Sequence, residues 1–339
     1  MAKILITGGC GFIGSHTIVD LINNGFEVIS IDNLSRSQAS IFDGIEKITG
    51  KRVKNFEIDI SDEAQLKSIY PELEGIDGII HFAAYKAVGE SVEQPLLYYK
   101  NNIGSLINIL EASKALKIPH FVFSSSCTVY GNVQKLPVDE NTPMGTAESP
   151  YGLTKQMGEA IINDFIKAHS DHQSILLRYF NPVGAHSSAF IGELPIGVPS
   201  TLVPYITQTA IGIRKELTIF GDDYDTRDGS CIRDYVHVMD IANAHTKALQ
   251  YMIDGKMSQA IDIFNLGTGN GVSVLEAVES FQKVNNLKLN YKIGPRRSGD
   301  VVAVYADNSK AKDVLGWDVK YDLDEMMRSA WEWQKRLSD

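Results

Sequence analysis

Tyr151 and Lys155 are residue types that can move a proton together, and they lie four positions apart in a stretch with helical spacing. Their side chains are therefore expected on one helix face. A tyrosine phenol titrates at about 10, so a base near neutrality requires a shift of about 3 units, roughly 4 kcal/mol. An ammonium at about 4 Å supplies energy of that order at an intermediate effective dielectric. We interpret the pair as an acid–base catalyst, although this spacing alone commonly marks a surface lysine beside a packed tyrosine.

The run Ser124-Ser125-Ser126 closes the fifth predicted strand, at the sheet edge where Tyr151 is expected. Carboxyl ends of parallel strands are where such folds bind ligands. The hydroxyl of Ser126 can hydrogen-bond a substrate oxygen while charge develops on it. Cys127 follows directly, and we interpret it as a buried small thiol.

A glycine-rich segment, Gly8-Gly9-Cys10-Gly11-Phe12-Ile13-Gly14, separates the first predicted strand from a predicted helix. Glycines let the backbone turn tightly and approach a pyrophosphate at a helix N-terminus, where N–H groups favour anions. Alone, the pattern also fits a plain strand-to-helix turn. Asp32 ends the second predicted strand, at the interval expected for a carboxylate that binds an adenosine ribose. Because a carboxylate repels a 2′-phosphate, it favours NAD over NADP, although Arg36 nearby weakens that choice.

The elements that must position these residues alternate along the first half of the chain. Apolar, β-rich runs are followed by stretches with helical spacing that begin near Ser15, Pro95 and Pro150. This alternation is typical of a doubly wound parallel α/β sheet. The predicted strands are Lys3–Thr7, Glu27–Ile31, Lys54–Ile58, Gly78–Phe82, His120–Ser124 and Ser174–Phe180.

The composition changes after Asn181. Residues 182–200 are rich in Gly, Pro and Ser and predict a loop, whereas Lys215–Gly221 and Arg296–Asp307 predict strands of a smaller region. We expect Arg233–Tyr251, a strand end plus helix, and the strand Ala260–Leu266 to return to the first region. The predicted organisation is a Rossmann NAD-binding domain of residues 1–181 plus 234–266, and a smaller, discontinuous α/β substrate-binding domain of residues 182–233 plus 267–339.

The bulk composition disfavours several classes of partner. The 339 residues are 44% hydrophobic, which allows a large core, and the net charge of −10 disfavours nucleic acid and anionic membranes. An anionic substrate would need its own cluster of Arg or Lys. Neither the three cysteines nor the eight histidines have metal-binding spacing, and His81 and His237 are interpreted as structural residues. No apolar run reaches the length of a membrane span or signal peptide, so the cytoplasm is the expected location.

Motifs spread over essentially the whole chain carry a resemblance to a known family. They are GGCGFIGSHT, DNLSRS from Asp32, HFAAYKAVGES from His81, SSSCTVYG from Ser124, SPYGLTK from Ser149, RYFNPVGAH from Arg178, RDYVHVMD from Arg233 and PRRSGD from Pro295. In these motifs the chain resembles the UDP-glucose 4-epimerase family of extended short-chain dehydrogenases/reductases. The resemblance implies tightly bound NAD and a UDP-sugar that is epimerised at C4 through a 4-keto intermediate. It also implies a homodimer formed through the helices of Pro95–Lys117 and Pro150–Lys167.

The resemblance assigns the catalytic roles to Tyr151, Lys155 and Ser126. The implied cofactor-binding residues follow the dinucleotide from the pyrophosphate through the adenosine to the nicotinamide. They are Gly8, Gly11, Phe12, Ile13 and Gly14 at the pyrophosphate; Asp32 and Asn33 at the adenosine ribose; Asp59 and Ile60 beside the adenine; Phe82, Ala83, Lys86 and Ser124 along the cleft; and Tyr151, Lys155 and Tyr179 near the nicotinamide riboside.

The implied substrate-binding residues follow the UDP-sugar in the same way. They are Asn181, Arg233 and Arg297 at the diphosphate; Phe220 against the uracil; Asp300 at the uridine ribose; Thr201 and Leu202 beside the UDP; and Lys86, Ser126, Tyr151 and Val304 towards the sugar.

Two positions depart from the family pattern. Thr201 stands where the family often has asparagine, so that contact is in doubt. Val304 stands at the gate of the sugar pocket, where many members have tyrosine. If Val304 faces the sugar, the pocket has room for an N-acetyl group at C2. A one-residue slip would put Tyr305 there instead, and Val304 also fits as a β-branched strand residue.

Three alternatives remain open. A UDP-GlcNAc 4-epimerase would have the same catalytic residues. A nucleotide-sugar dehydratase needs an acid pair directly after the catalytic Ser/Thr position, whereas Ser126 precedes Cys127 and Thr128. A non-catalytic dinucleotide-sensing protein typically lacks the tyrosine or the lysine, and Tyr151 and Lys155 are both present.

Overall fold

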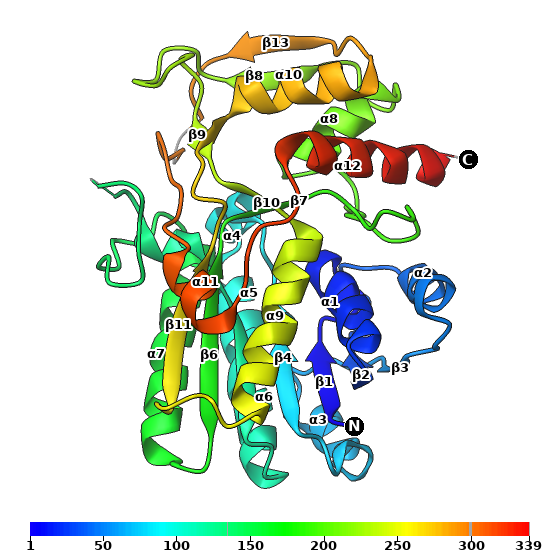
Figure 1. The fold of residues 1–339 in the computed structure, drawn as a ribbon, viewed down its shortest axis with the longest axis vertical. Coiled ribbons are helices and arrows are strands. Elements are labelled where there is room, and N and C mark those ends of the chain that lie inside the picture. The colour runs from blue at the N-terminus through cyan, green and yellow to red at the C-terminus, as the bar shows by residue number, and fades with distance from the viewer. Residues whose placement is uncertain (134, 298–299, 339) are drawn as a thin grey trace.

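A seven-stranded parallel sheet forms the centre of the protein, seen in a computed structural model that describes residues 1–133, 135–297 and 300–338 (Figure 1). The strand order is β11-β6-β5-β4-β1-β2-β3, and every neighbouring pair is parallel. The order reverses direction at β1, as in doubly wound folds, so the predicted fold class is confirmed. The strands are β1 (Lys3–Thr7), β2 (Glu27–Ile31), β3 (Lys54–Phe56), β4 (Gly78–His81), β5 (His120–Ser126), β6 (Gln173–Tyr179) and β11 (Ile261–Leu266).

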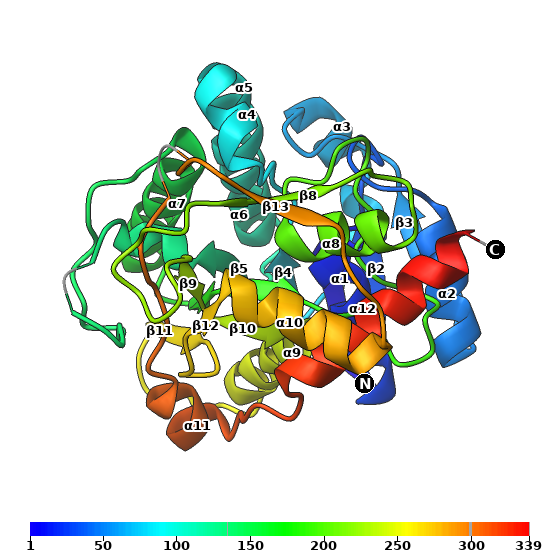
Figure 2. The same cartoon turned by 90° about the horizontal axis from the view of Figure 1, so that it is seen from above.

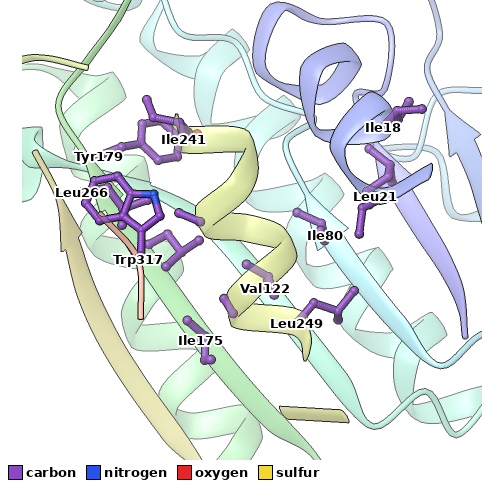
Figure 3. Close-up of a cluster of buried hydrophobic side chains, with 14 of the residues drawn as sticks. Ile18, Leu21, Ile80, Val122, Ile175, Tyr179, Ile241, Leu249, Leu266 and Trp317 are labelled. Carbon is purple, nitrogen blue, oxygen red and sulfur yellow. The ribbon is translucent and has the colours of Figure 1, made fainter. Parts of the chain in front are cut away.

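Helices cover both faces of this sheet because successive strand residues point to opposite sides. In β4, for example, Ile80 joins one apolar cluster and Ile79 the other. The first cluster, drawn in Figure 3, lies under α1 (Phe12–Asn23), α2 (Ser40–Thr49) and α9 (Val238–Ile253). The second lies under α3 (Glu63–Ser68), α6 (Gly104–Ala115) and α7 (Pro150–Ala168). The short helices α4 (Val88–Glu93) and α5 (Pro95–Tyr98) pack against α7, and three single turns are η1 (Tyr70–Leu73), η2 (Tyr99–Ile103) and η3 (Cys127–Tyr130).

A smaller layer stands over the carboxyl ends of the strands (Figures 1 and 2). Its own apolar cluster includes Ile206, Ile219, Phe281 and Met327. The helices are α8 (Leu202–Ala210), α10 (Val274–Asn285) and α12 (Leu323–Ser338), and β8 (Leu217–Phe220) pairs in parallel with β13 (Tyr291–Gly294). The connections between the layers hold β7 (Asn181–Val183) paired with β10 (Tyr235–His237), β9 (Ile232–Arg233) paired with β12 (Val272–Ser273), and α11 (Ser309–Leu315).

The prediction of a strand over residues 296–307 is wrong for the part of this segment that the structure describes. Residues 298–299 lie outside the described residues. The segment makes only isolated bridges, Val138 to Ala306 and Ile232 to Ala303. Its extended, apolar pattern resembles a strand, but its bridge partners are one residue of a loop, Val138, and one residue of the two-residue strand β9, Ile232, rather than one continuous partner strand. Val304 and Trp317 fall in the predicted second domain, but their side chains belong to the first apolar cluster, the one between the sheet and α1, α2 and α9. The exact division into two domains stays a prediction.

Candidate active site

The start of α7 fixes the position of Tyr151. Ser149 is the N-cap residue, and its hydroxyl accepts a hydrogen bond from the Gly152 N–H at 3.1 Å. Pro150 occupies the first turn, where its missing N–H costs no helical hydrogen bond. Tyr151 and Lys155 therefore lie in the first turns of a helix that packs against β5 and β6.

Lys155 is a buried cation at the end of β5. Its Nζ donates to the Ser124 carbonyl oxygen at 2.6 Å and lies 4.9 Å from the centre of the Phe123 ring. Burial lowers its pKa from 10.5 to about 8, and the nearby Glu159 carboxylate opposes this shift. The lysine is therefore mostly protonated at neutral pH, but only by a small margin.

The pKa of the Tyr151 phenol is shifted upwards, opposite to the lowering that we expected from Lys155. Burial raises its pKa to about 12, and a hydrogen bond with the Ser126 side chain lowers it only in part. The Lys155 Nζ is 5.9 Å from the centre of the tyrosine ring. The loss of hydration therefore dominates the pKa of Tyr151, and the Lys155 ammonium makes its hydrogen bond to the Ser124 carbonyl.

The hydroxyls of the serine run point to different partners. Ser124 Oγ hydrogen-bonds the hydroxyl of Tyr179, which is buried on β6. Ser126 Oγ accepts from the Thr128 N–H at 3.2 Å and lies beside Tyr151. Cys127 is partly buried, and desolvation raises the pKa of its thiol to about 12. The thiol is therefore no nucleophile near neutrality.

The glycine segment has the close contacts that a dinucleotide-binding turn requires. Gly8 has a φ of 74°, and a Cβ there would lie 2.8 Å from the Ala83 nitrogen. A Cβ on Gly14 would lie 2.2 Å from the Gly8 carbonyl oxygen. Gly11, the N-cap residue of α1, has no side chain to cover the first turn, where Phe12 and Ile13 begin the helix. The residues present fit a pyrophosphate at this helix N-terminus.

Asp32 lies at the end of β2 beside this turn. Its carboxylate accepts hydrogen bonds from the N–H groups of Cys10 and Leu34, both at 2.9 Å, and from the Ser37 hydroxyl. Arg36, the residue that weakened the choice of NAD, is paired with Glu90 at 2.7 Å and lies over the Tyr85 ring. The guanidinium is thus engaged elsewhere, and the carboxylate remains the group suited to a ribose.

The remaining residues assigned to the cofactor lie along the same strand ends. Asn33 accepts from Ser35 in the loop after β2. Asp59 accepts from the Ser61 N–H and hydroxyl, and Ile60 is buried. Ala83 donates its N–H to Thr7 at 3.3 Å, and Phe82 packs against His245, with ring centres 4.6 Å apart. Lys86 reaches across to Glu193 in the second layer, where Nζ and Oε1 are 2.9 Å apart.

Two arginines assigned to the substrate share one carboxylate. Arg297 donates to Asp300 at 2.7 and 3.2 Å, and Arg233 donates to the same group at 3.4 Å. The Arg297 guanidinium is 5.6 Å from the centre of the Phe220 ring, which is 42% exposed. The structure thus brings Arg233, Arg297, Asp300 and Phe220 together, as a cationic cluster beside an open aromatic face.

The other residues assigned to the substrate lie at the start of β7 and at the start of α8. Asn181 donates its backbone N–H to the Asp234 carbonyl at 2.9 Å, and Thr201 and Leu202 begin α8. The Thr201 hydroxyl donates to Glu193 at 3.2 Å. Sequence reasoning missed Glu193, which contacts both Lys86 and Thr201, because no motif marks it.

Val304 and Tyr305 face different surroundings. Val304 is 8% exposed and packs with the cluster under α9, whereas the Tyr305 ring lies next to Gly271. The two side chains therefore diverge, as expected for an extended segment. Which of them borders a bound sugar stays a prediction.

The histidines interpreted as structural have partners in the core. His81 Nδ1 is 2.8 Å from the Thr7 hydroxyl, and His237 Nε2 is 3.2 Å from the Ser329 hydroxyl. Within residues 1–133, 135–297 and 300–338, no group of three or more His, Cys, Asp or Glu side chains could hold a metal ion. No helix in the same ranges is long and apolar enough to cross a membrane.

Comparison with known proteins gives matches along nearly the whole chain. The family model described as GDP-mannose 4,6 dehydratase matches residues 5–330. The UDP-glucose 4-epimerase of Haemophilus influenzae is 48% identical over 332 residues, covering 98% of this chain and 97% of its own. The crystal structure of the Bifidobacterium longum UDP-glucose 4-epimerase with NAD+ and UDP has a TM-score of 0.94 and 44% identity, covering 99% of this chain and 98% of that one.

A second solved structure agrees with the first. The UDP-glucose 4-epimerase of Stenotrophomonas maltophila, with bound NAD and formylated UDP-arabinopyranose, has a TM-score of 0.95 and 43% identity, covering 100% of this chain and 99% of that one. The family model bears a dehydratase's name, but these full-length relatives are epimerases, and Ser126 has no carboxylate after it. The chain therefore belongs to the UDP-glucose 4-epimerase family of the extended short-chain dehydrogenases/reductases.

Proposed function

We propose that this protein is an NAD-dependent isomerase that interconverts UDP-glucose and UDP-galactose through a 4-keto intermediate. The single observation that carries the proposal is the grouping of Tyr151, Lys155 and Ser126 at the end of β5, in a chain whose full-length relatives are UDP-glucose 4-epimerases. The glycine turn and Asp32 support NAD as the cofactor. Bound NAD+ would accept hydride from C4 and return it, and its positive nicotinamide would favour the Tyr151 phenolate.

Within this proposal, Tyr151 removes the proton of the C4 hydroxyl and later returns it to the keto oxygen. Ser126 hydrogen-bonds the same oxygen, so that charge developing on it has a donor. Lys155, mostly protonated at neutral pH, favours the ionised phenol and would also bond the nicotinamide ribose. The transferred proton and the oxidation state of C4 are both restored at the end of a cycle, so no net co-substrate is consumed.

The cationic cluster supports a diphosphate-linked substrate. Arg233 and Arg297 are the local positive groups that an acidic chain needs to hold an anion. Phe220 presents an exposed ring for the uracil, and Asp300 a carboxylate for the uridine ribose. If the diphosphate is held there while the sugar is not, the 4-keto sugar can swing about its tether and present its opposite face.

The relatives favour one of the possible substrates over the others. UDP-GlcNAc 4-epimerase as the main activity is less favoured, since the full-length relatives described above are UDP-glucose 4-epimerases. Activity on both pairs of sugars remains our proposal, based on Val304. The cytoplasmic location also stays a prediction.

We also propose a homodimer. Apolar side chains of α4, α5, α6 and α7 are exposed, although these helices pack against one another in one subunit. They are Val92 at 60%, Leu96 at 71%, Ile107 at 42% and Met157 at 41% exposed. Such a surface suits a second copy of the same helices.

The proposed function is tested by incubating the purified protein with UDP-galactose and no added NAD, and identifying the product. Formation of UDP-glucose up to an equilibrium mixture is expected. A 4-keto-6-deoxy product would instead indicate dehydration, and recovery of unchanged substrate would contradict the assignment. A panel of UDP-hexoses, including UDP-GlcNAc, then defines the substrate range.

A further inference from the structure

A buried row of polar side chains crosses the sheet directly beneath the proposed catalytic residues. Ser125 on β5 is the register partner of Arg178 on β6, and Arg178 is the register partner of Asn265 on β11. All three are at most 2% exposed. Because partners in a parallel sheet point to the same face, this row lies on one side of the sheet, and α7 covers that side.

Glu159 of α7 closes this row. Its Oε1 accepts from the Ser125 hydroxyl at 2.5 Å and from Arg178 Nε at 2.9 Å, and its Oε2 accepts from Arg178 Nη2 at 2.6 Å. The side chains of Glu159 and Arg178 are both 3% exposed. A bidentate ion pair with an additional hydroxyl donor is among the strongest polar arrangements available in a protein interior.

The other end of the row reaches the segment that carries Val304. Arg178 donates to the Tyr130 hydroxyl at 3.1 Å, which in turn donates to Asn265 at 2.6 Å. Asn265 donates to the carbonyl oxygen of Val138, whose own N–H bonds the Tyr305 carbonyl at 3.0 Å. The network therefore ties α7, three strand ends and the 303–307 segment into one unit.

Lys155 lies one helical turn before Glu159, so the two side chains are neighbours on α7. The charged and titratable groups around the ammonium come from three elements. Glu159 and Tyr151 lie on α7, Arg178 lies beyond Glu159 on β6, and His81 lies on β4. His81 is neutral, because burial lowers its pKa to about 3, so it adds no positive charge beside the ammonium. The Glu159 carboxylate is the negative charge that opposes the lowering of the Lys155 pKa.

We propose that Glu159, held by Arg178 and Ser125, is a positioning residue for the proposed epimerase site: its carboxylate keeps Lys155 protonated and fixes the end of β5 against α7. The Lys155 ammonium needs this charge because it is buried, with a single protein acceptor described for it, the Ser124 carbonyl. The inference rests on the proposed function for its kinetic consequence, but not for its effect on Lys155 itself. Glu159 does not touch the reacting atoms and acts through Lys155.

The test compares the pH profile of kcat/KM for the holoenzyme and for Glu159→Gln, which keeps the side-chain shape and removes the charge. Loss of the carboxylate lowers the pKa of Lys155 further, so the alkaline limb of the profile should move to lower pH by about one unit or more. Since Glu159→Gln leaves a buried guanidinium unpaired and can impair folding, the double variant Glu159→Gln/Arg178→Gln removes both charges. A smaller shift of the limb in the same direction is expected there, because removal of the Arg178 charge partly offsets removal of the Glu159 charge.

A matched control is Asp262→Asn. Asp262 is also a largely buried carboxylate in an ion pair, with Lys310 at 2.6 Å, but it lies near the start of β11, away from the catalytic end. This variant should lose stability without moving the limb. An unmoved limb in both Glu159 variants, with kcat/KM lowered equally at every pH, would show that the pair is only structural and overturn the proposal.

A direct titration separates this inference from the proposed function. The chemical shift of the Lys155 Cε, assigned with Lys155→Met in lysine-labelled protein, reports the protonation of Lys155 whether or not the protein is an epimerase. A lower midpoint in the Glu159 variants supports the inference even if no epimerisation is found. An unchanged midpoint refutes it even in a fully active enzyme.

Discussion

The Nζ of Lys155 lies 2.6 Å from the backbone carbonyl oxygen of Ser124, so the lysine of α7 is tied to the last residues of β5. The carbonyl partly replaces the water that the ammonium loses on burial, and the lysine keeps its charge at neutral pH. The same strand end carries Ser126 and, through the Ser124 hydroxyl, the contact with Tyr179. A proton-transfer site built this way depends on charge, burial and strand position together.

Replacing Tyr151 with phenylalanine should lower kcat by at least ~10²–10⁴-fold, the usual contribution of a positioned acid–base group. The fold should persist, because only one buried hydroxyl is lost. Product formation from UDP-galactose and the amount of bound NAD are the measurements. Tyr251→Phe, on α9 and packed against the main apolar cluster, is the control and should keep normal turnover. Near-normal turnover in Tyr151→Phe would contradict the assignment of Tyr151 as the catalytic acid–base residue.

Lys155→Met should abolish most activity and yet raise the free energy of unfolding of the cofactor-free protein. Burial lowers the pKa of Lys155 from 10.5 to about 8, which corresponds to a desolvation penalty of up to about 3 kcal/mol at neutral pH. The unfolded chain holds this proton up to about pH 10.5, so the penalty is full below about pH 8 and declines as the pH rises between these values.

Urea denaturation at several pH values checks this prediction. The stability gain of Lys155→Met over the wild type should be largest near pH 7 and should shrink as the pH is raised from 8 towards 10. A variant that is less stable than the wild type at neutral pH would contradict it.

Denatured protein should release NAD or NADH rather than NADP, since Asp32 would face the 2′-phosphate. Asp32→Ala combined with Glu90→Gln removes that carboxylate and frees Arg36 from its partner, so NADP affinity should rise relative to NAD affinity. Glu90→Gln alone is the control, because it leaves the Asp32 carboxylate in place. Release of mainly NADP from the wild type would refute the choice of cofactor.

Val304→Tyr should remove turnover of UDP-GlcNAc through steric clash and leave UDP-galactose turnover largely intact. Because Val304 is 8% exposed, the larger ring should also cost about 1–3 kcal/mol of stability through overpacking, which thermal denaturation measures. The prediction that Val304 at the gate leaves room for an N-acetyl group is wrong if the wild type converts UDP-galactose but not UDP-GlcNAc. Gain of UDP-GlcNAc turnover in Tyr305→Gly would then assign the gate to Tyr305.

Leu96→Glu should weaken the proposed homodimer, because it places a charge on the most exposed apolar side chain of α5. Sedimentation equilibrium of the variant should show a dissociation constant raised at least tenfold. Ile213→Glu, which changes a 62% exposed residue after α8, should leave the association unchanged. A wild-type protein that sediments as a monomer, or a Leu96→Glu variant that dimerises normally, would exclude these helices as the interface.

The sequence by itself determined the parallel sheet and the residues at its carboxyl ends. Short apolar runs, the glycine segment from Gly8 to Gly14 and the spacing of Tyr151 and Lys155 are local patterns. Each depends on a few neighbouring residues and the period of one helix or strand, so each can be read without knowing the rest of the chain. The strands of the central sheet matched their predicted positions within about two residues for this reason.

Only the tertiary structure decided which groups share an environment. The segment 296–307 has the pattern of a strand, but a strand needs a continuous partner, and the described part of this segment makes only single bridges, to Val138 in a loop and to Ile232 in the two-residue strand β9. The pKa of Tyr151 rises because burial desolvates it, and the ion pair of Glu159 with Arg178 joins residues 19 positions apart in the sequence. Desolvation and ion pairing depend on which distant segments meet, and a local pattern carries no information about that.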